Sequence, residues 1–168
     1  YGYVKVVPFV KDITTTPYDD EIFKTSDVYI SGLDNVYGRL YLNVASMINK
    51  KPLIDGGMEA FDGYVQVVVP GRTPCLHCML TEHQMKTIYD RMSCSGEIDD
   101  SSIPKVPSIA TTTSLIAAIE AQEAAKIVLN SSDPENPKYK TLAGKILHYS
   151  GGTGFVGVFE VQRNPSCD

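Results

Sequence analysis

The stretch from residue 28 to residue 57 places a strand, a helix and a second strand in direct succession. "DVYIS" favours a strand, and it runs into the Gly/Asp/Asn turn of "GLDN". Residues 35–49 follow as an amphipathic helix, because their apolar side chains recur at helical spacing. Those side chains are Val36, Leu40, Val44, Met47 and Ile48. "KPLIDGG" is a further strand and turn, so the unit predicts an α/β domain with a partly parallel sheet.

Further elements are predicted on both sides of this unit. "VKVVPF" at residues 4–9 favours a strand, and "DEIFKTS" favours a short helix. "GYVQVVVPG" predicts a strand, and "TEHQMKTIYDRM" at residues 81–92 predicts a short helix. The Ala-rich residues 108–129 predict a long helix, with Ser108 as its cap. "KILHYSG" and "FVGVFEVQRN" predict a terminal antiparallel hairpin.

Composition argues against nucleic-acid binding and against membrane insertion. The net charge is −5 and no run of Lys and Arg exceeds two residues, whereas binding to phosphate backbones needs concentrated positive charge. The apolar stretches are too short or too interrupted to span a bilayer, and no basic-then-apolar leader precedes them. We therefore expect a cytoplasmic protein with no nucleic-acid or membrane partner. Because the chain opens on "YGYVKV" without an initiator Met, we also expect it to be part of a longer protein.

Cys75 and Cys78 form a Cys-x-x-Cys pair after a strand and a Pro-Gly turn. Two thiolates at this spacing can both reach one tetrahedral Zn²⁺ ion. A redox pair would instead stand at the start of a helix in a thioredoxin-like unit, and two buried free thiols are the third alternative. Cys167 follows the last predicted strand and could close on the pair. The fourth ligand would then be Cys94 or a residue after Asp168.

Cys94 stands apart in a loop of small and acidic residues. A nucleophilic cysteine needs exposure and a lowered pKa. The loop supplies exposure, but its nearest cations are Arg91 and Lys105. A reactive thiol and an inert surface thiol therefore both remain open.

Asp34 and Asn35 stand at the end of a predicted parallel strand, directly before a helix. Doubly wound folds bind ligands at this position, and a carboxylate there can hold Mg²⁺ against a nucleotide phosphate. The alternative is that either residue caps the following helix. Arg39, one turn later, could pair with Asp34 or with a phosphate.

Several of these stretches, in this order, resemble the ubiquitin-activating enzyme superfamily, which includes the ThiF- and MoeB-like adenylating enzymes. They are "SGLDNVYGRLYLN", "KPLIDGGMEAFDGYVQVVVPGRTPCLHC", "VPSIATTTSLIAAIEAQEAAKIV" and the hairpin ending "RNPSC". The resemblance covers nearly the whole chain but only the C-terminal half of the adenylation domain. It implies a Rossmann-like mixed sheet, with the glycine-rich ATP loop in the N-terminal half of the nucleotide-binding domain, which is missing here.

The resemblance also implies a reaction. Family members bind ATP, Mg²⁺ and the C-terminal Gly–Gly tail of a ubiquitin-like or sulfur-carrier protein. They attach AMP to the tail carboxylate, release pyrophosphate, and in many cases pass the acyl group to a cysteine as a thioester. An acyl-adenylate has a good leaving group, and the metal offsets phosphate charge during transfer. Members are usually dimers, so we expect a homodimer or a heterodimer.

Individual roles follow from the same resemblance. Asp34 matches the aspartate that contacts nucleotide and Mg²⁺, which makes it a catalytic and cofactor-binding candidate. Asn35 and Arg39 match the cofactor-binding positions that follow it. The zinc-binding candidates are Cys75, Cys78 and Cys167, the last as the first cysteine of a second pair. Cys94, in a loop at about residues 91–107, falls where the family places its acceptor cysteine.

The resemblance leaves three activities open. The favoured one is activation of a ubiquitin-like protein, followed by thioester formation on Cys94. The second is adenylation of a sulfur carrier for thiamine or molybdopterin synthesis. The third is a non-catalytic, zinc-stabilised partner subunit. Residues 1–168 are expected to form the C-terminal portion of one adenylation domain, and these residues alone are expected to be inactive.

Overall fold

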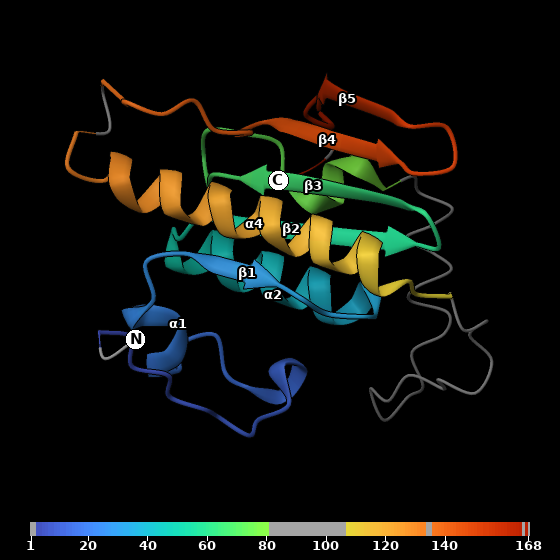
Figure 1. Cartoon of the computed structure of the whole chain (residues 1–168). Helices are drawn as coiled ribbons and strands as arrows, with labels where there is room; N and C mark the ends of the chain where they lie inside the picture. Colours follow the sequence, from blue (N-terminus) through green and yellow to red (C-terminus); the bar gives the residue numbers. More distant parts are fainter. Residues whose placement is uncertain (1–2, 81–106, 134–135, 166, 168) are drawn as a thin grey trace.

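The computed structural model describes residues 3–80, 107–133, 136–165 and 167. Its centre is a five-stranded sheet in the order β1-β2-β3-β4-β5 (Figure 1). The strands are β1 (Tyr29–Ser31), β2 (Leu53–Glu59), β3 (Asp62–Val68), β4 (Lys145–Ser150) and β5 (Phe155–Glu160). The helices are α1 (Glu21–Thr25), α2 (Val36–Asn49) and α4 (Ala110–Asn130), with 3₁₀ turns η1 (Ile13–Thr15) and η2 (Leu76–Met79).

The sheet is mixed. β1 runs parallel to β2, with Tyr29 opposite Leu53 and Ser31 opposite Asp55. Every other neighbouring pair of strands is antiparallel, including the β4–β5 hairpin. The parallel pair needs a crossover connection, and α2 provides it. The prediction of a partly parallel sheet with a terminal antiparallel hairpin is therefore confirmed.

Helix α2 begins where the sequence predicts. Asn35 is its N-cap, and the side-chain oxygen of Asn35 accepts a hydrogen bond from the Gly38 amide at 2.7 Å. Leu40 and Ala45 bury its apolar face against Tyr29 of β1, in a core that Leu53 of β2 also joins. This packing fixes the strand-to-helix turn, which carries Asp34.

Helix α4 packs on the other face of the sheet, across β2 and β3 (Figure 1). Its Ile116 joins Ile54, Val65 and Val67 in a second buried cluster. The cap prediction is wrong, because Ile109 is the N-cap and makes no side-chain capping bond. Ser108 instead forms an isolated parallel bridge with Ala60, just past the end of β2.

Glu123 joins α4 to the chain that leads into β4. Its side chain is 3% exposed, and its Oε2 accepts a hydrogen bond from the Leu142 amide at 2.8 Å. Its Oε1 accepts one from Lys126, whose ammonium also donates to the Lys140 carbonyl. A buried carboxylate with these partners holds the C-terminal half of α4 to the segment that precedes β4.

Replacing Glu123 with alanine should destabilise the protein. We expect a loss of about 2 kcal/mol in the free energy of unfolding, because the Leu142 amide and the Lys126 ammonium each lose an acceptor. Urea unfolding measures this loss. Gln122→Ala, at an exposed position of the same helix, is the control and should change stability by less than about 0.5 kcal/mol. Equal effects of the two substitutions would contradict this role for Glu123.

The predicted strand at residues 4–9 is wrong. Residues 4–10 form no strand, and their apolar side chains, including Val6 and Phe9, are exposed. β-branched residues form a strand only where a neighbouring strand pairs with them, and no described strand lies beside this segment. The helix predicted at residues 81–92 lies outside the described residues.

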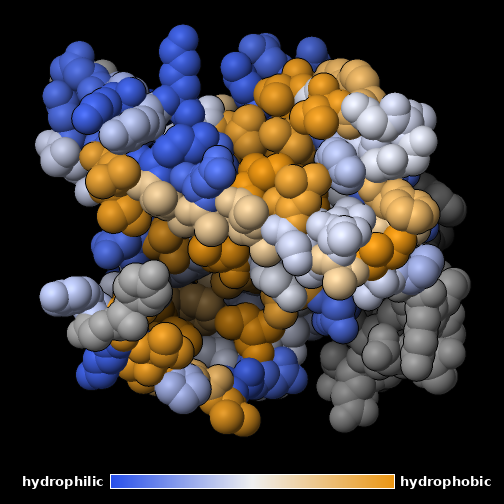
Figure 2. Space-filling model, in the orientation of Figure 1, coloured by the Kyte–Doolittle hydropathy of each residue, from blue (hydrophilic) through white to orange (hydrophobic). Residues whose placement is uncertain are grey.

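Apolar side chains also reach the surface of the folded part. Figure 2 shows hydrophobic surface across the middle of the face on which α4 lies. The exposed large apolar residues include Leu115, Val128 and Leu129 of α4 and Phe155, Val156, Val158 and Phe159 of β5. None of the described helices combines the length and apolar character needed to cross a bilayer.

Candidate functional site

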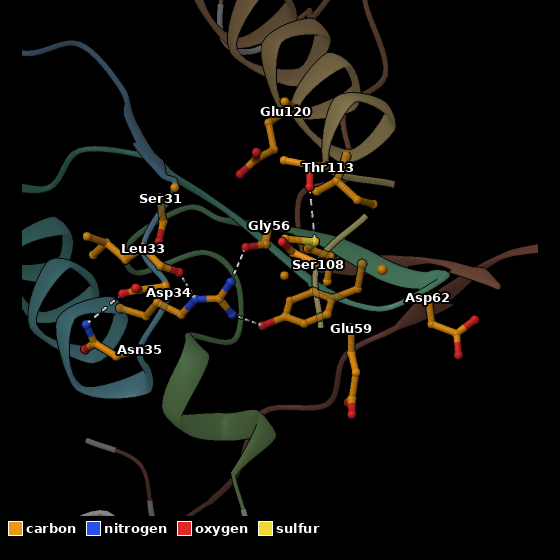
Figure 3. Close-up of a pocket in the computed structure, with 18 of the residues that line it drawn as sticks. Ser31, Leu33, Asp34, Asn35, Gly56, Glu59, Asp62, Ser108, Thr113 and Glu120 are labelled. Atoms are coloured by element: carbon orange, nitrogen blue, oxygen red, sulfur yellow. Dashed lines mark hydrogen bonds between the residues drawn. The ribbon is translucent and has the colours of Figure 1, made fainter. Parts of the chain in front are cut away.

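A cleft of about 910 Å³ opens where β1 ends and β2 continues. β1 stops at Ser31, opposite Asp55, whereas β2 runs on to Glu59. No described strand pairs with Gly56–Glu59 on the β1 side, so this edge of β2 forms one wall of the cleft. Other walls come from the turn before α2 and from the N-terminal half of α4 (Figure 3).

The predicted nucleotide-site residues gather in this cleft. Asp34, Asn35 and Arg39 all line it. Asn35 caps α2, whereas the exposed Asp34 accepts only one described hydrogen bond, from the Asn35 side chain at 3.2 Å. Asn35, and not Asp34, therefore caps α2. The carboxylate of Asp34 stays accessible to a ligand.

Arg39 binds protein groups on three sides. Its Nε donates to the Leu33 carbonyl at 3.0 Å, and its Nη1 donates to the Tyr64 hydroxyl at 2.6 Å. Its Nη2 donates to the Gly56 carbonyl (Figure 3). Its ion pair is with Asp55 at 3.7 Å, so the alternative of a pair with Asp34 is wrong. Arg39 therefore ties the turn that carries Asp34 to the free edge of β2.

Asp55 and Tyr64 complete the network beneath the cleft. Asp55 is 1% exposed, and its Oδ2 accepts a hydrogen bond from Tyr64 at 3.2 Å. Burial raises the pKa of Asp55 despite the opposing charge of Arg39. Burial, with the charge of Asp55, raises the pKa of Tyr64 to about 12. The phenol therefore stays a hydrogen-bond donor at neutral pH.

Glu120 reaches the cleft from α4, on the other face of β2. It is 7% exposed, and its Oε1 has no hydrogen-bond partner among the described residues. Burial, followed by the charge of Asp55, raises the pKa of Glu120 to about 7. A backbone hydrogen bond from Gly56 and the charge of Arg39 oppose this rise, so Glu120 is a partly satisfied buried acid at the cleft wall.

Two glycines make room for these side chains. A Cβ on Gly56 would lie 2.6 Å from the Glu120 carboxyl carbon, and one on Gly57 would lie 2.4 Å from the Tyr64 ring. Consecutive residues of a strand face opposite sides of the sheet, so the Gly-Gly pair admits Glu120 on one face and Tyr64 on the other. A larger residue at Gly56 would displace Glu120, and one at Gly57 would displace Tyr64.

The cysteine candidates form a separate cluster, packed against the core that α2 shares with η2. The Sγ atom of Cys75 lies 3.9 Å from that of Cys78 and 3.4 Å from that of Cys167. All three sulfurs lie within 4.8 Å of one another. A tetrahedral zinc–thiolate site places sulfurs about 3.8 Å apart, so the three residues fit three corners of such a site.

Hydrogen bonds lower the pKa of Cys75 and so favour its thiolate form. Burial opposes ionisation of Cys75, but hydrogen bonds from His77 and Cys167 outweigh it and lower its pKa to about 6. The three thiols are not joined as disulfides. Cys94 lies outside the described residues, so its role remains a prediction.

Sequence reasoning missed several residues of the cleft. No motif in the sequence singles out Tyr64, Glu120 and His148, which line the cleft, or Asp55, which pairs with Arg39 beneath it. One available signal was the Gly-Gly pair after Asp55, because paired glycines inside a strand often mark a close approach of other groups.

A comparison with protein-family models matches residues 1–168, the whole chain, to the "ThiF family". The ubiquitin-activating enzyme E1-like protein of Saccharomyces cerevisiae is 40% identical over 81 residues, which cover 46% of this chain and 12% of that protein. The adenylyltransferase and sulfurtransferase MOCS3 of Drosophila ananassae is 26% identical over 147 residues, or 87% of this chain and 29% of that protein.

Solved structures agree on the fold. E. coli MccB, solved with ATP, superposes with a TM-score of 0.58 at 19% identity, over 84% of this chain and 38% of MccB. At that identity the likeness concerns the fold alone. The chain therefore spans less than half the length of each of these three proteins.

Proposed function

Because this chain belongs to the ThiF family, we propose that it takes part in ATP-dependent adenylation of the C-terminal carboxylate of a ubiquitin-like protein. The observation that carries the proposal is the accessible carboxylate of Asp34 at the open end of a parallel strand, held in place by Asn35 and Arg39. Parallel strands of α/β sheets present ligand sites at this end. Relatives of the chain include adenylyltransferase and E1-like proteins.

In this proposal Asp34 holds Mg²⁺ against the phosphates of ATP. Carboxylate oxygens are the ligands that Mg²⁺ prefers, and an ion held there would supply positive charge beside the pyrophosphate group. Asn35 places the first amides of α2 beside the nucleotide, where a helix N-terminus attracts phosphate. Arg39 contributes by fixing the turn, because its nitrogens already bind protein acceptors.

The proposed reaction is transfer of AMP from ATP to the tail carboxylate. An oxygen of the substrate carboxylate attacks the α-phosphorus of ATP, the bond to the bridging oxygen breaks, and pyrophosphate leaves with the electron pair. Past Gly56, whose carbonyl already accepts a hydrogen bond from Arg39, no described strand pairs with β2 on the β1 side, so an extended substrate tail could lie along residues 57–59. A tail ending in Gly–Gly could lie close to this edge, because it brings no side chain of its own there.

We further propose that Cys75, Cys78 and Cys167 hold a structural Zn²⁺ ion. This ion would tie η2 to the last described residues of the chain. With a fourth ligand to close it, a site of this kind would contribute to folding and take no part in the chemical step. A homodimer or heterodimer is the assembly that we expect.

Two other functions remain as alternatives. Adenylation of a sulfur carrier is favoured by the similarity to MOCS3, which is named an adenylyltransferase and sulfurtransferase. A non-catalytic partner subunit would keep the zinc cluster and a protein-binding surface without needing Asp34. The sequence and the fold are compatible with both.

One experiment separates these functions. The intact protein is incubated with [³²P]pyrophosphate, MgATP and candidate carrier proteins, and exchange of label into ATP is followed. We expect exchange with at least one carrier ending in Gly–Gly, together with a thiol-sensitive adduct that is lost in Cys94→Ala. Cys94 can form such an adduct only if its side chain is exposed and ionises to a thiolate. The mass of the adduct identifies the carrier directly.

The outcomes are distinct. Exchange without a Cys94 adduct favours the sulfur-carrier alternative. No exchange with any carrier favours the non-catalytic subunit and contradicts the proposal. Ser93→Ala is the matched control, because it changes the adjacent residue and should leave the adduct intact.

A further inference from the structure

A second pocket, of about 660 Å³, lies at the end of the sheet opposite the cleft that contains Asp34. Its walls come from the start of β2, the turn after β3, the end of α4 and the segment before β4, which meet at the left of Figure 1. Its volume is typical of ligand pockets, which range from about 300 to 1,000 Å³. The proposed adenylation uses no residue of this pocket, so a ligand bound there would add a second binding function.

This pocket is basic, although the chain as a whole has a net charge of −5. Among the described residues that line it, Asp27 carries the one negative charge, and the cations are Lys50, Lys51, Arg72 and Lys140. None of the four cations has an ion-pair partner within 4.0 Å in the described part of the chain. A concave surface with an excess of one charge sign raises the local concentration of ligands with the opposite sign, which here are anions.

Apolar side chains line the same pocket. Val69, Ile127 and Ala143 contribute half-buried surface and pack against the cluster that β2, β3 and α4 bury between them. Val128 and Tyr139 are more open, with 49% and 37% of their surface exposed. Covering such surface is favourable, so the pocket suits a ligand that combines negative charge with an apolar group.

Hydrogen bonds hold two walls of the pocket in place. On one wall, the side chain of Asn130 donates to the Tyr139 carbonyl at 2.8 Å and accepts from the Tyr139 amide at 3.0 Å. On another, the Thr73 hydroxyl accepts a hydrogen bond from the Val69 amide at 2.8 Å, which closes the turn that carries Arg72. Because both segments are tied to the fold, little ordering is needed when a ligand binds.

The backbone at Lys50 gives a sign of function that is independent of the number of charges. Lys50 ends α2 in the left-handed conformation, with φ 54° and ψ 38°. Glycine is the residue that adopts this conformation without strain, and strained positions cluster at ligand-binding sites. A positive charge is also favourable at the C-terminus of a helix. That interaction explains the charge of Lys50 but does not require Lys50 to line a pocket with three further cations.

We propose that this pocket binds an acidic segment of a partner protein, in which Asp or Glu residues flank an apolar side chain. The carboxylates face Lys51, Arg72 and Lys140, and the apolar side chain packs on Val128 and Tyr139. A nucleic acid would match the cations but leave the apolar surface uncovered, and an uncharged apolar segment would do the reverse. A segment held here leaves the cleft at the other end of the sheet open.

The test measures binding of six-residue, fluorescein-labelled peptides to the intact protein by fluorescence anisotropy. The first peptide has Leu-Phe at its centre and two acidic residues on each side. The second replaces Leu-Phe with Ser-Ser, and the third replaces every Asp and Glu with Asn and Gln. We expect the dissociation constant of the first to be at least about tenfold below those of the other two. Raising NaCl from about 50 mM to about 500 mM should weaken the first peptide toward the third.

The double variant Arg72→Glu/Lys140→Glu identifies the residues responsible. Both side chains are exposed and form no described ion pair, so the circular dichroism spectrum should be unchanged. We expect the first peptide to bind at least about tenfold more weakly, because two attractive contacts become repulsive. Lys5→Glu/Arg163→Glu is the matched control, since it reverses one lysine and one arginine at exposed residues outside the pocket. Its dissociation constant should stay within about twofold of normal.

A third variant, Lys50→Gly, separates binding from folding. Glycine relieves the left-handed backbone at this position, so the midpoint of urea unfolding should not fall. The first peptide should nevertheless bind about threefold more weakly, because one cation of the pocket is lost. Unchanged binding in this variant would contradict the place of Lys50 in the site.

Three results would overturn the inference. They are equal binding of the three peptides, binding that survives in Arg72→Glu/Lys140→Glu, and stronger binding of a single-stranded oligonucleotide than of the first peptide. ATP–pyrophosphate exchange separates this inference from the proposed function, because the double variant should keep exchange within about twofold of normal. Peptide binding without exchange supports the acidic partner and contradicts adenylation. Exchange without peptide binding supports adenylation and contradicts the acidic partner.

Discussion

Asp34→Asn should reduce ATP–pyrophosphate exchange by about 100-fold or more. The substitution keeps the size of the side chain but removes the charge that we propose to hold Mg²⁺. Because Asp34 accepts only one described hydrogen bond and is exposed, its loss should leave folding intact. Circular dichroism and the midpoint of urea unfolding should therefore match the unsubstituted protein, and the defect should appear mainly in kcat.

A matched control lies at the other end of β1. Asp27 is an exposed aspartate just before the start of β1, at the end of the strand opposite Asp34. Asp27→Asn removes the same charge from the protein, and we expect exchange within about twofold of normal. If Asp34→Asn also retains exchange at that level, Asp34 is not the residue that holds the metal.

Cys75→Ser should remove bound zinc and lower thermal stability by about 6–12 °C. A structural zinc ion contributes binding free energy directly to folding, and loss of even about 3 kcal/mol shifts a protein of this size by that amount. Metal content by mass spectrometry and the melting temperature are the two measurements. A chelator should lower the melting temperature of the unsubstituted protein to the same value and have no further effect on the variant.

Two further variants test whether the loss of zinc is specific to the ligand residues. Met79→Ala changes an exposed non-ligand residue of η2, and zinc content should stay at one ion per chain. Cys94→Ser decides the fourth ligand, because zinc is lost only if Cys94 completes the site. A full complement of zinc in Cys75→Ser would contradict the proposed metal centre.

The elements that the sequence predicted well are those with local signals. α2 combines a helical apolar pattern with an Asn cap, and it begins at Val36, where the pattern starts. The β4–β5 hairpin alternates around a glycine-rich turn, and it pairs as expected. The gathering of Cys75, Cys78 and Cys167 was predicted from spacing and from the family resemblance, although the first and last are 92 residues apart.

The missed features depend on tertiary neighbours. "VKVVPF" has strong β-propensity but lacks a pairing strand among the described residues, so propensity alone was misleading. Ser108 is well placed for a cap, yet it bridges to Ala60 instead. Glu120 and Glu123 have the composition of a solvated helix face, and only the packing of α4 on the sheet reveals that both are buried.

The candidate site was predicted in part for the same reason. Asp34 and Asn35 follow from a strand-to-helix turn, which is a local pattern. The partners of Arg39 come from three different segments, so the sequence could not reveal that the guanidinium is already engaged. The charged side chains that line the cleft likewise come from the turn before α2, from α2, and from β2, β3 and α4.

The contact between Cys75 and Cys167 has a consequence for how the chain folds. It joins residues 92 apart and encloses α4, β4 and β5 in one loop. Closing a loop of about this length costs the unfolded chain roughly 4–5 kcal/mol of conformational entropy. If the bound metal closes the loop first, α4, β4 and β5 fold without this entropic cost. A metal-linked Cys75–Cys167 contact would then influence the order in which the sheet assembles. It would keep β4 and β5 close to β3 before these strands pair.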